Sequence, residues 1–254
     1  MGIAIPQVIT PSKASGAQVI DGSLRFDGSQ ELEFTPGSDG DLKTATWSFW
    51  AKRAKFGSND TVLGFGPNNT NDGQIYFNTS DKIYIYFRKS SSTQLTYETT
   101  RVFRDTGWYH IVVSVDTTQA SGQVKLYVNG EEVTSFGTST DTTQNADLII
   151  NDATYTNYIG NARGNTSTDL DCMLSNVYLI DGQRLDASYF GFTDPLTNTW
   201  KPKKYTGTFG TNGFWLPMDG NSPIGQDKSG NGNDWTPVNF GGSVALDSPQ
   251  VSGA

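Results

Sequence analysis

The segment Val124-Lys-Leu-Tyr-Val-Asn-Gly-Glu131 alternates apolar and polar side chains and ends in an Asn-Gly pair. Alternation with a period of two places its three aliphatic residues on one face of a pleated strand. Asn129 and Gly130 both tolerate the positive φ of a two-residue type I′ turn. The segment therefore predicts a β-hairpin.

The same alternation recurs along the chain, in residues 24–27, 31–34 and 83–88. No window of ten residues has the apolar spacing of a helix, and only residues 186–190 resemble a helical turn, with Asp186 as the N-cap. Only five of the 26 acidic residues are glutamate, which favours helices, whereas Asp, Asn, Gly, Ser and Thr favour turns. We expect an all-β fold, an antiparallel β-sandwich.

Length and charge exclude several classes of protein. A chain of 254 residues can bury a core without disulfides, and its single cysteine, Cys172, lies in a strand pattern that predicts a buried, inert thiol. The net charge of −8 argues against a nucleic-acid partner. No segment approaches the roughly 20 apolar residues that span a bilayer, and the first residues lack a signal-peptide pattern. We expect synthesis in a reducing cytoplasm, with neither nucleic acid nor membrane as partner.

Three regions differ in composition. Residues 1–22 read as an extended N-terminal arm, and residues 23–190 carry the strand series. Residues 191–254 are rich in Gly, Asn and Pro but contain three tryptophans. Because a disordered tail would not carry so many large aromatics, we expect this loop-rich segment to pack on the sandwich.

A resemblance to a known superfamily rests on six segments in a fixed order. They are Leu24-Arg-Phe-Asp-Gly28, Ala45-Thr-Trp-Ser-Phe-Trp-Ala51, Gly107-Trp-Tyr-His-Ile-Val-Val113, Val124-Lys-Leu-Tyr-Val-Asn-Gly-Glu131, Tyr158-Ile-Gly-Asn161 and Cys172-Met-Leu-Ser-Asn-Val-Tyr-Leu-Ile180. This succession, over about residues 23–190, resembles the laminin G-like, or concanavalin A-like, jelly-roll superfamily. The segments Asp181-Gly-Gln-Arg-Leu-Asp186 and Trp200-Lys-Pro-Lys-Lys-Tyr-Thr-Gly207 look like the version found in virion proteins of tailed bacteriophages, especially marine ones. The segment Phe214-Trp-Leu-Pro-Met-Asp219 is similar to the entry strand of ordinary members of the superfamily. This likeness implies a strand over 214–219 that joins the same sandwich, with the stub of a second module as the alternative.

Glycoside hydrolysis is the enzymatic alternative on such a fold, and it needs two carboxylates flanking the scissile bond. The hydrolases that resemble this fold carry Glu-x-Asp-x-x-Glu on one strand, and the sequence has no such triplet. Glu31 and Glu33 share a strand face, but alternation with solvent-facing polar residues explains them. His110 shares a face with Trp108 and Val112, so we interpret it as a hydrogen-bonded core residue and not as a catalytic base. The sequence predicts a protein that is not an enzyme.

Calcium is the only metal for which the sequence offers candidate ligands, because zinc and redox metals need more Cys and His residues. The segment Asp227-Lys-Ser-Gly-Asn-Gly232 has oxygen-bearing side chains at its first, third and fifth positions, yet Val238 stands where the closing Glu of a calcium loop would be. Asp227 and Asn231 are therefore calcium candidates, with a hydrogen-bonded Gly-Asn turn as the alternative. No other cofactor is expected.

Glycan binding would use an exposed aromatic ring beside polar side chains. Trp200 and Trp235 lie among turns, and Asn165 belongs to the polar loop 161–171. These three residues are the candidates for glycan contacts, with packing in the core as the alternative for the tryptophans.

The leading hypothesis is a non-enzymatic structural protein on the outside of a phage particle, decorating the capsid or associated with a vertex or the tail. Residues 1–22 would form a docking arm, whose apolar anchors are Ile3, Ile5, Val8 and Ile9. A flexible leader without a docking role is the alternative. The partners would be other virion proteins and further copies of the chain, and the location would be the virion. A carbohydrate-binding, host-recognition module of a tail fibre is the alternative, with a host-surface glycan as partner. A polysaccharide hydrolase, supported by fold analogy alone, is the third hypothesis.

Overall fold

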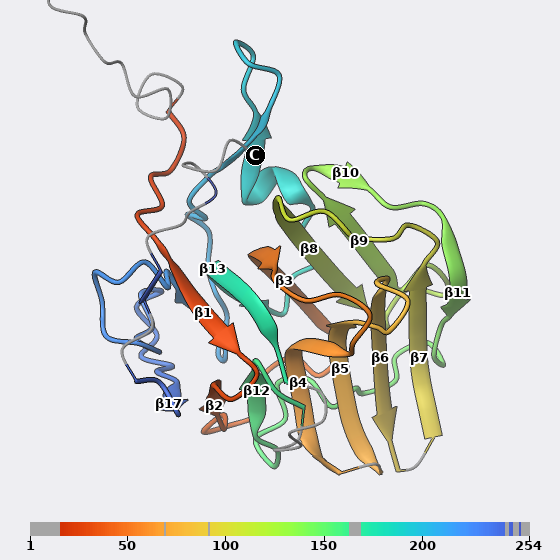
Figure 1. Cartoon of the computed structure of the whole chain (residues 1–254). Helices are drawn as coiled ribbons and strands as arrows, with labels where there is room; N and C mark the ends of the chain where they lie inside the picture. The colour runs from red at the N-terminus through yellow and green to blue at the C-terminus, as the bar shows by residue number, and fades with distance from the viewer. Residues whose placement is uncertain are drawn as a thin grey trace, which may run out of the picture.

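Two antiparallel sheets of eight strands each pack face to face in the computed structural model of the chain (Figure 1). The structure describes residues 16–68, 70–90, 92–162, 169–241, 244–245 and 249. In sheet A, the strands in spatial order are β10 (Glu131–Glu132), β9 (Val124–Val128), β8 (Trp108–Asp116), β3 (Thr44–Arg53), β13 (Asp171–Asp181), β1 (Ser23–Asp27) and β18 (Val244–Ala245), and β16 (Phe214–Leu216) also pairs with β13.

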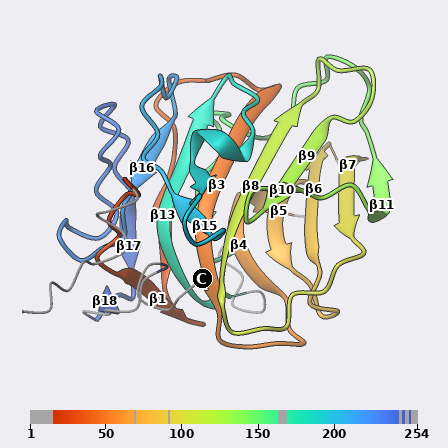
Figure 2. The ribbon, with the colours of Figure 1, turned by 90° about the horizontal axis from the view of Figure 1, so that it is seen from above.

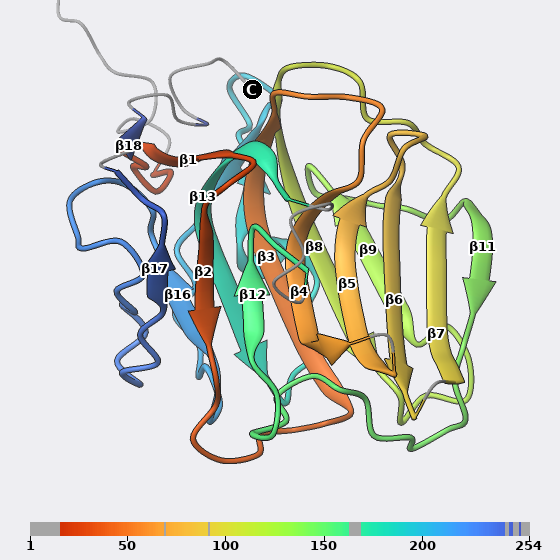
Figure 3. The same cartoon turned by 60° about the horizontal axis from the view of Figure 1, so that its bottom comes forward.

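Sheet B forms the second layer, and Figure 3 shows most of its strands side by side. Its strands in spatial order are β11 (Phe136–Thr140), β7 (Ser92–Thr99), β6 (Ile83–Lys89), β5 (Asn71–Phe77), β4 (Asp60–Asn68), β12 (Asn157–Ile159), β2 (Glu31–Phe34) and β17 (Thr236–Val238). The prediction of an all-β, antiparallel sandwich is confirmed.

The main core lies between the two sheets, where each strand directs alternate side chains inward. On β6, for example, Ile83, Ile85 and Phe87 are buried, whereas the tyrosines between them are half-buried on the outer side. Trp47 of β3 packs from the opposite sheet against Phe87, with 6.2 Å between ring centroids. The apolar rows found by alternation are therefore the rows that fill the interior.

Local predictions hold at two turns and at one buried thiol. Asn129 and Gly130 have φ values of 50° and 84° and connect β9 to β10, as the hairpin prediction requires. Asp186 caps the 3₁₀ helix η1 (Ala187–Tyr189) by accepting a hydrogen bond from the backbone N–H of Ser188. Cys172 is buried in the core, and this burial raises the pKa of its thiol to about 12.

Residues beyond 190 add strands to both layers. Within sheet A, β16 pairs with β13 and β18 with β1, while β17 pairs with β2 in sheet B. The strand β16 ends at Leu216, three residues earlier than the expected 214–219, because Pro217 follows and Met218 has a positive φ of 55°. Together, these strands place the side chains of Phe214 and Leu216 in the main core.

A second layer of packing covers the outer face of sheet A. The helix η1 and a two-stranded hairpin, β14 (Gly191–Thr193) and β15 (Trp200–Pro202), lie over β13 and β3 in the view from above (Figure 2). Tyr178 of β13 packs there against Phe190, and Trp50 of β3 lies beside Trp200. The outer face of sheet A is therefore covered over β13 and β3, which alternation alone does not predict.

None of the helical segments in the described part of the chain has the length and hydropathy that crossing a bilayer requires.

Candidate functional site

A groove opens on the outer side of sheet A, where the β9–β10 turn meets the β14–β15 hairpin. Its volume is about 300 Å³. The lining residues are Trp50, Arg101, Val128, Asn129, Glu131, Asn198, Thr199 and Trp200. We call it the Trp200 groove. It brings together segments from four distant parts of the chain, which only the packed sandwich places side by side.

Trp200 forms a fixed wall of this groove. A Cβ atom at Gly130 would lie 2.3 Å from the Trp200 ring, and one at Gly191 would lie 2.4 Å from it. The two glycines therefore let the indole lie directly against the backbone of the turn and of the hairpin. The indole Nε1–H donates a hydrogen bond to Nδ1 of His110 at 2.9 Å, so the ring is held by packing and by a hydrogen bond.

His110 is fully buried beneath Trp200, and its hydrogen bonds fix its tautomer. Because the indole N–H of Trp200 donates to Nδ1, that nitrogen is an acceptor and the ring proton lies on Nε2. Nε2–H then donates to Oγ of Ser48 at 2.9 Å. Burial lowers the pKa of His110 to about 3, so the ring is neutral at neutral pH.

This arrangement decides what His110 can do chemically. A catalytic base accepts the proton of a serine hydroxyl, whereas Nε2 of His110 donates its own proton to Ser48. The interpretation of His110 as a hydrogen-bonded core residue is confirmed. In the groove it acts as a positioning residue for Trp200.

The rim of the groove is polar. Arg101, Asn129, Glu131 and Asn198 are all exposed. Asn129 is held in place because its Oδ1 accepts a hydrogen bond from the backbone N–H of His110 at 2.8 Å. A cation, an anion and two amides therefore surround an aromatic wall, and this combination can hydrogen-bond a ligand that carries many hydroxyl groups.

Trp235 lies elsewhere, in the main core. Its side chain is only 4% exposed, and its ring centroid lies 5.0 Å from that of Phe214 and 5.4 Å from that of Phe34. The expectation that Trp235 presents a ring to a glycan is therefore corrected: the pairing of β17 with β2 brings the neighbouring Trp235 inward. Asn165 and the arm residues Ile3, Ile5, Val8 and Ile9 lie outside the described residues.

The loop predicted as a calcium candidate is closed by its own hydrogen bonds. The Asp227 carboxylate accepts from the backbone N–H groups of Trp215, Ser229 and Asn233 at 2.9, 2.8 and 3.1 Å, and from Oγ of Ser229 at 2.7 Å. The Asn231 side chain uses its amide nitrogen to donate to two backbone carbonyls.

Bound calcium would have to displace the N–H donors that already occupy the Asp227 carboxylate. In the described ranges, no three side chains of His, Cys, Asp or Glu gather as metal ligands would. The geometry matches the hydrogen-bonded Gly-Asn turn that the sequence left as the alternative. Calcium binding at Asp227 and Asn231 stays a prediction.

The two carboxylates considered for hydrolysis lie on β2 of sheet B, whereas the Trp200 groove lies on sheet A. Glu31 and Glu33 are half-buried on the outer side of sheet B, and Leu32 between them is fully buried. Burial raises the pKa of Glu31, whose carboxylate accepts a hydrogen bond from the side-chain amide of Asn161. Strand alternation accounts for this placement.

Two face-packed antiparallel sheets with a shallow aromatic groove define a β-sandwich of the lectin type. The family model described as the concanavalin A-like lectin/glucanases superfamily (Laminin_G_3) matches residues 26–187, and the chain belongs to this family. The resemblance to the laminin G-like and concanavalin A-like jelly rolls is thereby confirmed. A search of curated protein sequences finds no match.

Solved structures are similar to the chain at low sequence identity. A putative carbohydrate-binding protein from Bacteroides ovatus is 17% identical with a TM-score of 0.59, and the match covers 91% of this chain and 62% of that one. The SAP-like pentraxin of Limulus polyphemus is 14% identical, with a TM-score of 0.49 and coverages of 66% and 80%. Domains LG4-5 of the mouse laminin α1 chain are 12% identical, with a TM-score of 0.48 and coverages of 82% and 50%. The match thus spans less than two thirds of the Bacteroides and laminin chains.

Of the predicted glycan contacts that the structure describes, Trp200 lies in the groove and Trp235 does not. Sequence reasoning missed Arg101 and Asn198, which no local pattern distinguishes from other loop residues. Glu131, which follows the predicted turn and was not proposed as a glycan contact, is exposed and borders the groove. The signal that could have found it is the Asn129-Gly130 turn, since a glycine there leaves room for a large neighbouring ring.

Proposed function

We propose that the chain is a non-enzymatic carbohydrate-binding protein and that its Trp200 groove holds a sugar ring. The observation that carries this proposal is the Trp200 indole, fixed as the wall of a groove of about 300 Å³ with a polar rim. The C–H groups on one side of a pyranose are attracted to the negative face of an aromatic ring. The sugar hydroxyls would exchange hydrogen bonds with Arg101, Asn129 and Glu131.

Two features of the groove support a role without catalysis. His110 is neutral and donates to Ser48, so it is not placed to activate a nucleophile. Glycoside hydrolysis needs two carboxylates about 5 to 9.5 Å apart, and the described residues that line the groove include one, that of Glu131. Binding without reaction is what such a groove can do.

Sugar binding can be tested with substitutions at Trp200 of β15 and with matched variants of Glu131 and Glu132 on β10. A glycan array would identify ligands of the wild-type chain, and titration calorimetry would give their affinities. We expect Trp200→Ala and Glu131→Ala to weaken binding about tenfold, the effect of losing roughly 1.4 kcal/mol of contact. Glu132→Ala is the control, because Glu132 pairs with Lys125 at the surface and does not line the groove. A wild-type chain that binds no sugar at millimolar concentration would refute this function.

We further propose that the protein is displayed on the particle of a tailed bacteriophage, either decorating the capsid or associated with a vertex or the tail. The support is the resemblance of residues 181–186 and 200–207 to phage virion proteins. The partners would be other virion proteins, a host-surface glycan and further copies of this chain. Mass spectrometry of purified particles, followed by cryo-electron microscopy to locate the chain on head or tail, tests this role. Purified phage particles in which mass spectrometry finds no peptide of this chain would refute the virion role.

A further inference from the structure

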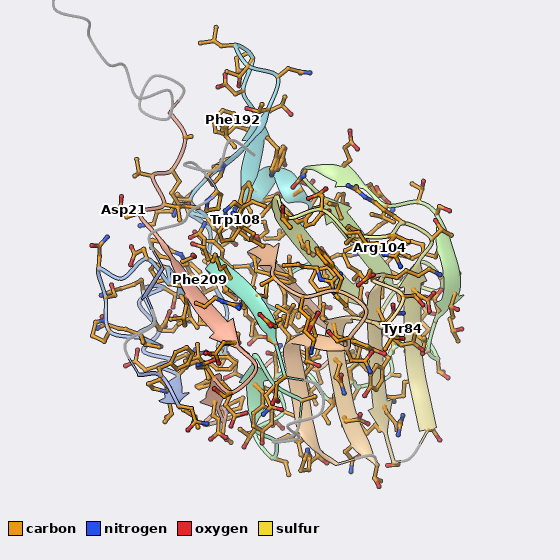
Figure 4. The ribbon with its side chains drawn as sticks, viewed as in Figure 1. Asp21, Tyr84, Arg104, Trp108, Phe192 and Phe209 are labelled. Atoms are coloured by element: carbon orange, nitrogen blue, oxygen red, sulfur yellow. The ribbon has the colours of Figure 1, made fainter. Side chains whose placement is uncertain are left out.

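A second aromatic surface lies on the outer side of sheet B. Tyr76 of β5 and Tyr84 and Tyr86 of β6 are half-buried there, because the residues that alternate with them fill the core. Together with Arg88 and Thr96 they line a trough of about 240 Å³. We call this surface the tyrosine face. Figure 4 shows Tyr84 on the side of the molecule formed by β6 and β7. Trp108, which belongs to the cluster that Trp200 packs against, lies on the side of the β14–β15 hairpin.

The three tyrosine rings form one continuous surface. Tyr76 and Tyr84 are direct cross-strand partners, and their ring centroids are 5.3 Å apart. Tyr86 follows two residues after Tyr84 on the same strand, with centroids at 6.1 Å, and it meets Tyr76 edge-on at 6.3 Å. Rings at these distances contact one another, so the face is an extended aromatic platform.

A buried polar network fixes the inner part of the platform. Oη of Tyr86 donates to the Asp72 carboxylate and accepts from Nε2 of Gln74 at 2.9 Å. Oε1 of Gln74 accepts in turn from Oγ1 of Thr61 at 3.2 Å. Asp72, Gln74 and Thr61 are all buried, so the Tyr86 ring is held in place before any ligand arrives.

The charges around the trough are paired. Nε of Arg88 lies 3.6 Å from Oδ1 of Asp72, and Nζ of Lys82 donates to Glu98 at 2.7 Å. Since the cation beside the rings is balanced by Asp72, the face offers little attraction to an anionic sugar. The chain as a whole carries a charge of −8, which disfavours anions further.

From this geometry we propose that the tyrosine face is a second, independent binding site, which takes the pyranose rings of a neutral polysaccharide. The rings supply the apolar surface, and Thr96 and the Tyr76 hydroxyl supply hydrogen bonds. A trough of this size suits one or two sugar rings, whereas a stable protein interface needs about 1,000 Å² of buried surface with an apolar centre.

The two sites lie on the outer faces of opposite sheets, so one chain could hold two polysaccharide strands. The tyrosine face does not require the Trp200 groove, and either site can fail alone.

Affinity gel electrophoresis tests the proposal with a panel of soluble neutral polysaccharides: laminarin, xyloglucan, galactomannan and soluble starch. We expect at least one of them to retard the wild-type chain, and Tyr84→Ala to weaken that binding about tenfold. Tyr84→Phe, which keeps the ring, should remain within about twofold of the wild type. Thermal unfolding of each variant verifies that it is folded.

Two controls separate this site from the rest of the molecule. Tyr158→Ala removes another half-buried tyrosine of sheet B, on β12 and away from the trough, and should leave binding unchanged. Trp200→Ala should also leave the Tyr84-dependent binding unchanged, even if it abolishes sugar binding at the groove. The proposal is overturned if no polysaccharide in the panel retards the wild type, or if Tyr84→Ala binds as the wild type does. Loss of binding in Tyr158→Ala to the same degree as in Tyr84→Ala would also overturn it.

Discussion

His110 links the fold to the Trp200 groove through two hydrogen bonds, one to the indole of Trp200 and one to Ser48. Its imidazole is 1% exposed and has no partner that would stabilise a positive charge on it among these contacts. A group that must stay neutral in the folded state makes stability depend on pH, because the unfolded chain can protonate it freely.

The folded chain should lose stability as the pH falls from about 6.5 toward 3. In this range the unfolded His110 binds a proton with a pKa near its ordinary value of 6.5, whereas the folded residue, with a pKa of about 3, does not. The slope approaches about 1.4 kcal/mol per pH unit for one proton. His110→Gln lacks this titration. The difference in free energy of unfolding between the wild type and His110→Gln should therefore shrink by up to about 1.4 kcal/mol for each pH unit by which the pH is lowered. Urea unfolding at pH 7.5, 6.0, 5.0 and 4.5 measures this difference. If the free energies of unfolding of the two chains changed equally with pH, His110 would not be held neutral in the folded chain.

Loss of the Trp235 side chain should lower the stability of the fold and leave sugar binding unchanged. Trp235→Ala removes a fully packed ring between Phe34 and Phe214 and should lower the free energy of unfolding by about 3 to 5 kcal/mol. Sugar affinity of the folded fraction should stay unchanged. Urea unfolding and calorimetric titration of the same sample measure both quantities. A stability within 1 kcal/mol of the wild type would show that Trp235 is not in the core.

At the scale of single elements, the β9–β10 turn both closes a hairpin and shapes the groove. Gly130→Ala places a Cβ at a φ of 84° and 2.3 Å from the Trp200 ring. Gly122→Ala is the matched control, since Gly122 also has a positive φ, 62°, but has no atom within 4 Å of an added Cβ.

We expect Gly122→Ala to cost about 1 kcal/mol of backbone strain, and Gly130→Ala to cost a further 1 to 3 kcal/mol and to displace Trp200. Thermal unfolding gives the stabilities, and a red shift of the tryptophan fluorescence reports the displaced ring. Equal effects of the two substitutions would mean that the turn does not support Trp200.

Strand alternation predicted the elements well because it reports the period of the backbone, which is local. It identified the rows of β6 and β9 that fill the core. The local preferences of single residues for turns and caps identified the Asn129-Gly130 turn and the Asp186 cap. Alternation did not predict that the residues of β8 are buried on both faces of the strand. The residues that pack on the outer face of sheet A come from 187–205, far along the chain. Burial of an outer face is a tertiary property that no local pattern contains.

The candidate sites show the same limit. Trp200 and Trp235 lie in similar turn-rich sequence, yet one borders a groove and the other fills the core, because their places depend on pairing with distant strands. The sequence places Tyr84 and Tyr86 on the same face of one strand, because they are two residues apart. Its third member, Tyr76, joins them only through the register of β5 on β6, which the turn between these strands sets.

At the scale of the whole molecule, the family match and the folding unit have different extents. The match ends at residue 187, whereas Phe214, Leu216 and Trp235 lie in the same core cluster as Leu24. The strands β16, β17 and β18 extend both sheets from this C-terminal region. Residues beyond the family match are therefore part of the core and not an appendage.

A chain that ends at residue 205 should consequently fail to fold cooperatively. It lacks three large buried side chains, each worth about 1.5 to 3 kcal/mol of hydrophobic stabilisation, which together approach the 5 to 15 kcal/mol that holds a typical domain folded. Circular dichroism during urea titration should show a broad, shallow transition, and the dye ANS should bind the exposed core. A chain lacking only residues 250–254 is the control and should unfold sharply at the wild-type midpoint. If the chain of 205 residues instead unfolded in one sharp transition at that same midpoint, residues 206–254 would lie outside the folding unit, and the buried positions of Phe214 and Trp235 would have no energetic consequence.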